Sequence, residues 1–129
     1  MTSPLKDLIK YRLERAIETI EEAVLLANNN HWNASINRLY YACFYATNAL
    51  LIKHDLSSSK HSGVRVILNR EFVKKEIISK ELAAIYNDLF EYRKESDYED
   101  FYHVDPETVK QMIDKTKKYV NFIKKIIPR

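Results

Sequence analysis

Hydrophobic residues recur at steps of three and four along most of the chain, which is the spacing of one face of an α-helix. Five segments carry this pattern, at about 4–28, 32–54, 60–75, 79–98 and 105–127. The second is apolar nearly all round, which is typical of the most buried helix of a bundle. Short connections between long helices favour antiparallel neighbours. The pattern therefore predicts an all-α fold, a four- to five-helix up-and-down bundle, built as a single domain over residues 1–129.

Composition supports helices and excludes several classes of protein. The 129 residues include one glycine and three prolines, too few turn formers for a chain of β-hairpins. The one cysteine, Cys43, lies in the most apolar segment, so we expect it in the core, with no intramolecular disulfide and no CxxC motif. The single glycine also excludes the Gly-rich phosphate loops of nucleotide-binding folds.

Charge and histidine spacing add further expectations. The formal net charge is +3, which does not by itself indicate a nucleic-acid partner. The four histidines show no metal-ligand spacing, so we predict no metal and no cofactor. Charges interrupt the first 30 residues, and no apolar run reaches the roughly 20 residues that span a bilayer. We therefore expect a cytoplasmic protein without a membrane partner. The last segment carries six lysines. We interpret them as the solvent-exposed face of a helix, with contact to an RNA backbone as the alternative.

A polar and aromatic stripe runs along the second, apolar segment. Arg38, Tyr41, Tyr45 and Asn48 are spaced i, i+3, i+7 and i+10, so they share one helical face. A guanidinium inside a bundle must be paired or hydrogen-bonded. One interpretation is a core arginine neutralised by a carboxylate from a neighbouring helix. The other is the floor of a polar pocket that binds an anion, such as a nucleotide phosphate or an RNA backbone.

Two further groups could join this stripe. Arg93, Asp97 and Tyr98 lie near the end of the fourth segment, where Asp97 is the candidate partner of Arg38; a solvated helix end is the alternative. His61 precedes the only glycine, Gly63. Glycine there suggests a close approach to a neighbouring backbone or helix. His61 suits general acid–base chemistry or phosphate binding because it titrates near neutrality, although a lone histidine at a helix start is more often a hydrogen-bonding or capping group.

Three short blocks resemble one known family. RLYYACFYA at 38–46, KHSGV at 60–64 and RKESDY at 93–98 occur in the order and spacing found in small prokaryotic HEPN-domain proteins. The resemblance covers roughly residues 10–125. It implies a helical bundle that often forms a homodimer and is often encoded beside a minimal nucleotidyltransferase, as a toxin–antitoxin pair. Active toxins of this family are metal-independent ribonucleases, and in some pairs the nucleotidyltransferase adds AMP to a tyrosine near the catalytic motif.

The chain departs from the family's catalytic motif, an arginine followed after four to six residues by a histidine. Counting from Arg93, positions 98, 99 and 100 hold tyrosine, glutamate and aspartate. Arg93 therefore carries over as a phosphate-facing position and the catalytic histidine does not. Tyr98 is a weaker candidate for a modification acceptor.

We carry three hypotheses for function. The first is a non-catalytic module that binds a nucleotide, RNA or a nucleotidyltransferase partner through Arg38, Tyr41, Tyr45, Asn48, Arg93, Asp97 and Tyr98. The second is a divergent ribonuclease in which His61 moves protons while Arg38 or Arg93 stabilises the phosphate. The third is a homodimeric adaptor that uses its tyrosine-rich face.

Overall fold

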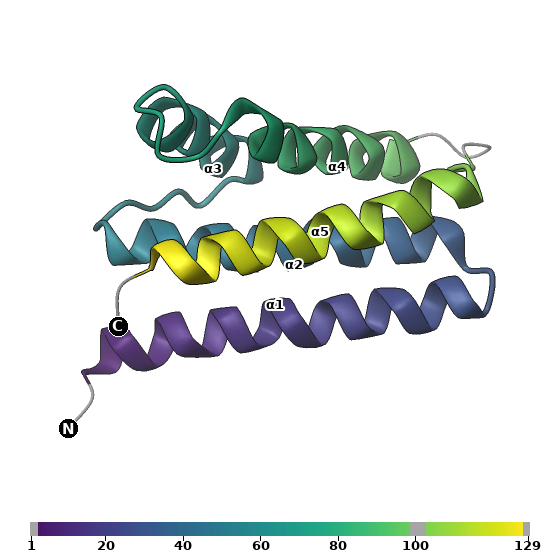
Figure 1. Cartoon of the computed structure of the whole chain (residues 1–129), viewed down its shortest axis with the longest axis horizontal. Helices are drawn as coiled ribbons and strands as arrows, with labels where there is room; N and C mark the ends of the chain where they lie inside the picture. Colours follow the sequence, from purple (N-terminus) through teal and green to yellow (C-terminus); the bar gives the residue numbers. More distant parts are fainter. Residues whose placement is uncertain (1–2, 99–102, 128–129) are drawn as a thin grey trace.

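The chain folds as a bundle of antiparallel helices. A computed structural model describes the backbone of residues 3–98 and 103–127, and their side chains except at 97 and 98. The elements in order are α1 (Pro4–Asn28), α2 (Trp32–Lys53), α3 (His61–Ile67), the π-helix η1 (Leu68–Val73), α4 (Lys80–Tyr98) and α5 (Pro106–Ile126). The long helices alternate in direction, and no strand occurs in the described ranges (Figure 1). The predicted all-α, up-and-down bundle is confirmed.

Local sequence signals set the helix ends. The backbone N–H of Lys6 donates to Oγ of Ser3 over 3.1 Å, and Pro4 opens α1 at a position where its missing N–H costs nothing. Ser79 caps α4 in the same way, accepting from the N–H of Leu82 over 3.1 Å. Asn30 turns the chain between α1 and α2 with a φ of 63°, a conformation that asparagine tolerates better than most residues.

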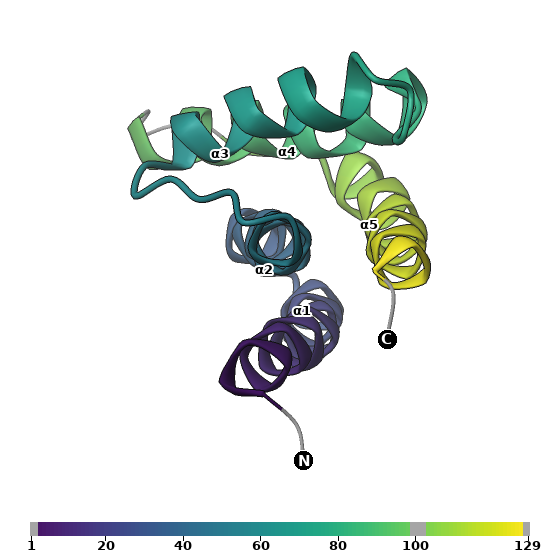
Figure 2. The same cartoon turned by 90° about the vertical axis from the view of Figure 1, so that its left-hand side faces the viewer.

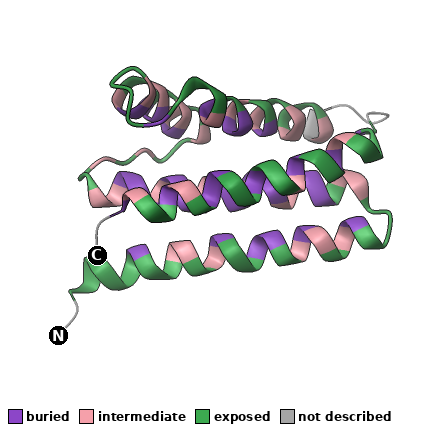
Figure 3. Ribbon diagram, in the orientation of Figure 1, coloured by how far each residue is buried: buried purple, intermediate pink, exposed green. Residues whose placement is uncertain are grey.

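The second helix is the centre of the molecule. Figure 2 shows α2 between α1 on one side and the layer of α3 and α4 on the other, with α5 alongside. Half of its residues are buried (Figure 3), as its continuous apolar sequence predicts. Two buried hydroxyls tie it to its neighbours. Ser35 Oγ donates to the carbonyl of Ala23 in α1 over 2.7 Å, and Thr47 Oγ1 lies 2.7 Å from the hydroxyl of Tyr119 in α5.

The third segment differs from the single helix predicted over 60–75. After seven α-helical residues the chain widens into η1, where the N–H of Lys74 donates to the carbonyl of Asn69 over 2.9 Å. This i→i+5 bond defines a π-helical turn. Leu68 and Phe72 are both buried in this arrangement. The segment ends at Glu76, which has a φ of 62°.

The single glycine allows the loop before α3 to pack against that helix. A Cβ built on Gly63 would lie 2.8 Å from Cβ of Ser58 and would overlap with Ser58 Oγ. Ser58 is itself fixed, since its Oγ accepts from the N–H of Lys60 over 3.2 Å. The lack of room for a side chain at this glycine is as predicted, but the neighbour is the side chain of Ser58 in the preceding loop and not a backbone or another helix.

Candidate functional site

Two arginines and a histidine from three helices gather around a patch of aromatic rings on α2. We call this set the cation–aromatic cluster. Its members are Arg38, Tyr40, Tyr41 and Phe44 of α2, His61 of α3 and Arg93 of α4. Most of them lie at intermediate depth, with only Tyr40 fully buried. The cluster is therefore reachable from solvent and rests on a rigid, buried base.

His61 is held in place from two directions. Its Nδ1 lies 2.7 Å from the hydroxyl of Tyr40. Its ring stacks on Phe44, with centroids 4.2 Å apart and planes only 8° from parallel. The ring is thus fixed in position and orientation, which leaves Nε2 as the atom that can serve a ligand.

The two arginines converge on one ring. The guanidinium carbon of Arg38 lies 5.0 Å from the centroid of Tyr41, and that of Arg93 lies 5.5 Å from the same centroid and 5.1 Å from that of Tyr40. Cations favour the electron-rich face of an aromatic ring at this range. Tyr41 therefore brings together two positive charges from different helices.

A carboxylate from α1 accompanies Arg38. Nη1 of Arg38 lies 3.6 Å from Oε1 of Glu22. The other carboxylate oxygen of Glu22, Oε2, lies 3.4 Å from Nη1 of Arg15. Arg38 keeps 28% of its side-chain surface exposed. Glu22 is thus a carboxylate of a neighbouring helix close to Arg38, but Arg38 is partly exposed and is not a core arginine, so both interpretations of this residue stay predictions. The side chains of Asp97, the predicted partner of Arg38, and of Tyr98 are not among those that the structure describes. The roles predicted for these two residues stay predictions.

The other predicted residues of α2 lie further along the helix. Tyr45 packs against Tyr41 with centroids 6.0 Å apart, and Arg15 of α1 lies over its ring at 5.5 Å. The side-chain amide of Asn48 donates to the carbonyl of Phe44 over 3.1 Å, within its own helix. Tyr45 thus extends the aromatic surface toward α1, while the contacts of Asn48 are local.

Three contributors were not predicted as site residues: Tyr40, Phe44 and Glu22. Tyr40 and Phe44 look like core residues in the sequence, because they belong to the apolar run. The signal for Tyr40 was its hydroxyl, which needs a partner when the ring is buried. Nothing in the sequence indicates that the partner is His61, 21 residues away.

Burial and a neighbouring charge shift the pKa of two members of the cluster. Burial lowers the pKa of His61 first, and the charge of Arg93 lowers it further, so its imidazole is neutral at pH 7. Burial raises the pKa of Tyr40 to about 12, which keeps its hydroxyl protonated. The cluster thus offers fixed cations and a neutral imidazole, a combination that suits a phosphate more than a cation.

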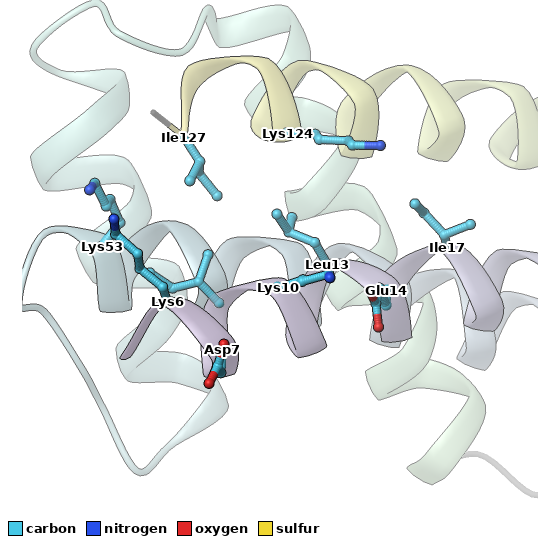
Figure 4. Close-up of a pocket in the computed structure, with 10 residues that line it drawn as sticks. Lys6, Asp7, Lys10, Leu13, Glu14, Ile17, Lys53, Lys124 and Ile127 are labelled. Carbon is cyan, nitrogen blue, oxygen red and sulfur yellow. The ribbon is translucent and has the colours of Figure 1, made fainter. Parts of the chain in front are cut away.

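A separate groove lies at the other end of the bundle, between the start of α1 and the ends of α2 and α5. Leu13 and Ile17 of α1 line it, with Ile127 on the opposite side near Leu13, and Lys6, Lys53 and Lys124 also line it (Figure 4). Its volume is about 590 Å³. None of the cluster residues lines it, so it is distinct from the candidate site.

The remaining chemistry-bearing residues add no second centre. Cys43 is buried, and burial raises the pKa of its thiol above the ordinary value, as expected for a core cysteine. Across residues 3–96 and 103–127, no group of three potential metal ligands comes together. Within that same part of the chain, no helix is long and apolar enough to cross a membrane.

Comparison with known proteins places the chain in a family. The model of the HEPN domain matches residues 9–126, so the chain belongs to the HEPN family. It is 43% identical over 120 residues to a UPF0332 protein of Thermotoga maritima, covering 93% of this chain and 91% of that protein. It is 29% identical to "Putative toxin MJ0142" of Methanocaldococcus jannaschii, covering 89% of this chain and 78% of that protein. A second protein of that organism, "Putative toxin MJ0605", is 28% identical over 76% of this chain and 73% of its own length. The family predicted from the three sequence blocks is confirmed.

Proposed function

We propose that this chain is a toxin-class HEPN module whose cation–aromatic cluster binds the phosphate of an RNA or a nucleotide. The observation that carries the proposal is the convergence of Arg38, Arg93 and His61 on the ring of Tyr41. Both guanidiniums lie over the ring of Tyr41, where each can donate charge-assisted hydrogen bonds to a phosphate oxygen. The similarity to two proteins named as putative toxins supports the toxin class.

Binding measurements with matched charge variants test the proposal. The probe is a 2′-O-methyl RNA oligonucleotide carrying a fluorophore, titrated with protein at about 0.1 M salt. Arg38→Ala together with Arg93→Ala is expected to weaken binding at least tenfold, since each charge-assisted contact contributes about 1.5–3 kcal/mol. The control removes two exposed lysines of α5, Lys115→Ala and Lys118→Ala, and so loses the same charge elsewhere. Equal effects of the two pairs would refute a specific site.

A second candidate, metal-independent RNA cleavage, is favoured by the position of His61. In the tautomer whose Nδ1–H donates to the hydroxyl oxygen of Tyr40, Nε2 is unprotonated and can accept the proton of a 2′-hydroxyl as that oxygen attacks the adjacent phosphorus. The bond to the 5′-oxygen then breaks, that oxygen takes up a proton from water, and a 2′,3′-cyclic phosphate forms. Tyr40 is too weak an acid to replace the histidine. His61→Ala is expected to abolish cleavage of unmodified RNA while leaving binding of the 2′-O-methyl probe within a few fold. Absence of cleavage by the wild type would leave binding as the function.

The partners remain part of this proposal. The family resemblance implies a homodimer and a minimal nucleotidyltransferase, and we expect the gene for the latter beside this one. Co-expression of the two chains, followed by size-exclusion chromatography with light scattering, tests for both the homodimer and the complex with the nucleotidyltransferase. A stable monomer that does not co-elute with the nucleotidyltransferase would remove both partners.

A further inference from the structure

A basic groove runs along α3 and η1, starting next to the cation–aromatic cluster. One wall comes from α3, η1 and the residue after η1, and Phe90 of α4 forms the other. The residues of the first wall are Ser62, Arg65, Val66, Asn69, Arg70 and Lys74. Its volume is about 610 Å³. Three of these residues are cationic and none is acidic. The groove therefore attracts an extended anion.

The π-helical turn is what directs the last cation into this groove. In an uninterrupted α-helix, residues i and i+4 lie one turn apart on the same face, so Val73 would follow Asn69. Here the N–H of Lys74 bonds to the carbonyl of Asn69, which places Lys74 one turn after Asn69 instead. Val73 is turned away and lines a different depression with Ile77 and Phe122. The one extra residue in the turn thus exchanges a valine for a lysine on the groove face.

Of the three cationic side chains in the groove, one is held by hydrogen bonds and two are exposed. Arg65 donates from Nε to Asn87 over 3.0 Å and from Nη1 to Glu91 over 2.8 Å, and it lies over Phe90 at 4.6 Å. It therefore builds the wall. Arg70 and Lys74 are exposed, and no ion pair among the described residues involves either of them. The carboxylate of Glu71, on the same turn, pairs with Lys75 over 3.1 Å.

The groove begins one helical turn from the candidate site. Arg65 in its wall follows His61 by four residues, so the two lie on the same face of α3. Arg65 also lies over Phe90, whose ring is 6.0 Å from that of Tyr40. From Ser62 to Lys74 the helix extends up to about 18 Å at about 1.5 Å per residue, which is longer than one nucleotide. Val66 is 56% exposed and offers an apolar contact within the charged wall.

We propose that the ligand is a single-stranded RNA whose backbone runs from the cation–aromatic cluster along this groove, with Arg70 and Lys74 binding successive phosphates. The inference rests on the proposed function and narrows it, because a groove of this length favours a polymer over a free nucleotide. A positive groove that continues from aromatic rings is the arrangement used to bind single strands. A duplex holds its bases in pairs and has no unstacked base to place against Val66 or Tyr41.

The test compares two probe lengths on variants that change only exposed side chains. Affinities of three- and twelve-nucleotide 2′-O-methyl RNAs are measured for the wild type, for Arg70→Ala/Lys74→Ala and for the control Lys115→Ala/Lys118→Ala. The groove variant is expected to bind the longer RNA about 25-fold more weakly at 0.1 M salt, because each lost single-strand phosphate contact carries a salt exponent of about 0.7. The slope of log Kd against log salt should fall by about 1.4. The short RNA and the control pair should change less than threefold.

Each alternative result has a distinct meaning. If the wild type binds both lengths and the groove variant binds them unchanged, the groove inference is wrong and the phosphate site stands. If the groove and control pairs lose the same affinity, the effect is diffuse charge and the groove is not a site. Tighter binding of a twelve-base-pair duplex would exclude the single strand. If the wild type binds no RNA at all, the proposed function fails as well.

Discussion

At the scale of single residues, the positions of several side chains depend on the hydrogen bonds of a few buried hydroxyl groups. Tyr40 has no exposed surface, yet its hydroxyl reaches a ring nitrogen of His61 at the surface. A tyrosine in a core serves this purpose because its ring is apolar and its end is polar. The hydroxyl thus converts a core residue of α2 into the anchor of a candidate site residue on α3.

The titration of His61 gives the first prediction. Burial and Arg93 hold its pKa below the ordinary 6.5 in the folded protein, so between these two values the unfolded chain binds more protons. The free energy of unfolding should therefore fall as the pH drops through 6.5 toward the pKa of His61 in the folded protein. Above pH 6.5, the full contribution of His61 to that free energy is present. Proton-detected NMR of the imidazole gives the pKa, and urea unfolding at pH 7.5 and 5.5 gives the stability.

His61→Asn is the matched control for this effect. The variant has no imidazole at this position, so it should lose the part of the stability difference between the two pH values that His61 contributes. A second measurement ties the residue to ligand binding: a bound phosphate places negative charge nearby and should raise the pKa of His61. A His61 pKa above 6.5 in the unliganded protein would contradict the described environment.

The buried pair Thr47 and Tyr119 gives a second prediction at this scale. Their oxygens lie 2.7 Å apart and join α2 to α5. Thr47→Val preserves the shape but leaves the hydroxyl of Tyr119 buried without this partner, which is expected to cost about 1–3 kcal/mol of unfolding free energy. Adding Tyr119→Phe removes the stranded group, so the double variant should recover part of the loss. A double variant less stable than the sum of the two singles would show that the pair is not the cause.

At the scale of the elements, the start of α3 depends on the only glycine. The loop from α2 packs Ser58 against Gly63, and His61 begins the helix two residues earlier. Any side chain at 63 must move Ser58, since both its Cβ and its Oγ stand in the way. The loop and the first turn of α3 are therefore coupled in position.

Gly63→Ala is expected to destabilise the protein by about 1–3 kcal/mol, which is typical of overpacking, and to shift the NMR signals of His61. Ser58→Gly removes the colliding atoms, so the double variant Ser58→Gly/Gly63→Ala should recover stability relative to Gly63→Ala. Ser58→Gly alone is the control for the loss of its own hydrogen bonds. Thermal unfolding of the four proteins measures the coupling. Unchanged stability of Gly63→Ala would show that the loop adjusts freely.

The elements themselves were largely predictable from the sequence, and η1 was not. Periodicity places α1, α2, α4 and α5 within a residue or two of their observed ends, because long amphipathic stripes and caps such as Ser3 and Ser79 are local signals. The π-helical turn has no such signal. It goes with the packing of Leu68 and Phe72, which are both buried in the core. That is a tertiary constraint, and it decides that Lys74 and not Val73 lies in the basic groove.

At the scale of the whole molecule, the candidate site exists only in the folded bundle. Its members come from α2, α3 and α4, and Glu22 of α1 approaches one of them. The shared face of Arg38 and Tyr41 was visible in the sequence because it lies within one helix. The choice of Glu22 as the neighbouring carboxylate was not, since it depends on how α1 packs against α2. Similarly, the resemblance to the HEPN family identified Arg93 but gave no distance between it and Arg38.

A site shared by several helices couples ligand binding to global stability, which gives the last prediction. A ligand that binds only the folded protein adds about 2.7 kcal/mol to the free energy of unfolding at 100 times its Kd. For a chain of this size, that corresponds to a rise in Tm of roughly 10 °C. Thermal unfolding with and without saturating 2′-O-methyl RNA should show this rise in the wild type and in Lys115→Ala/Lys118→Ala. Arg38→Ala/Arg93→Ala, at the same RNA concentration, should show at most about half of it, since a tenfold higher Kd leaves about 1.4 kcal/mol. An equal rise in all three proteins would mean that RNA stabilises the bundle through its general charge, and the convergence of the two arginines on Tyr41 would then have no part in binding.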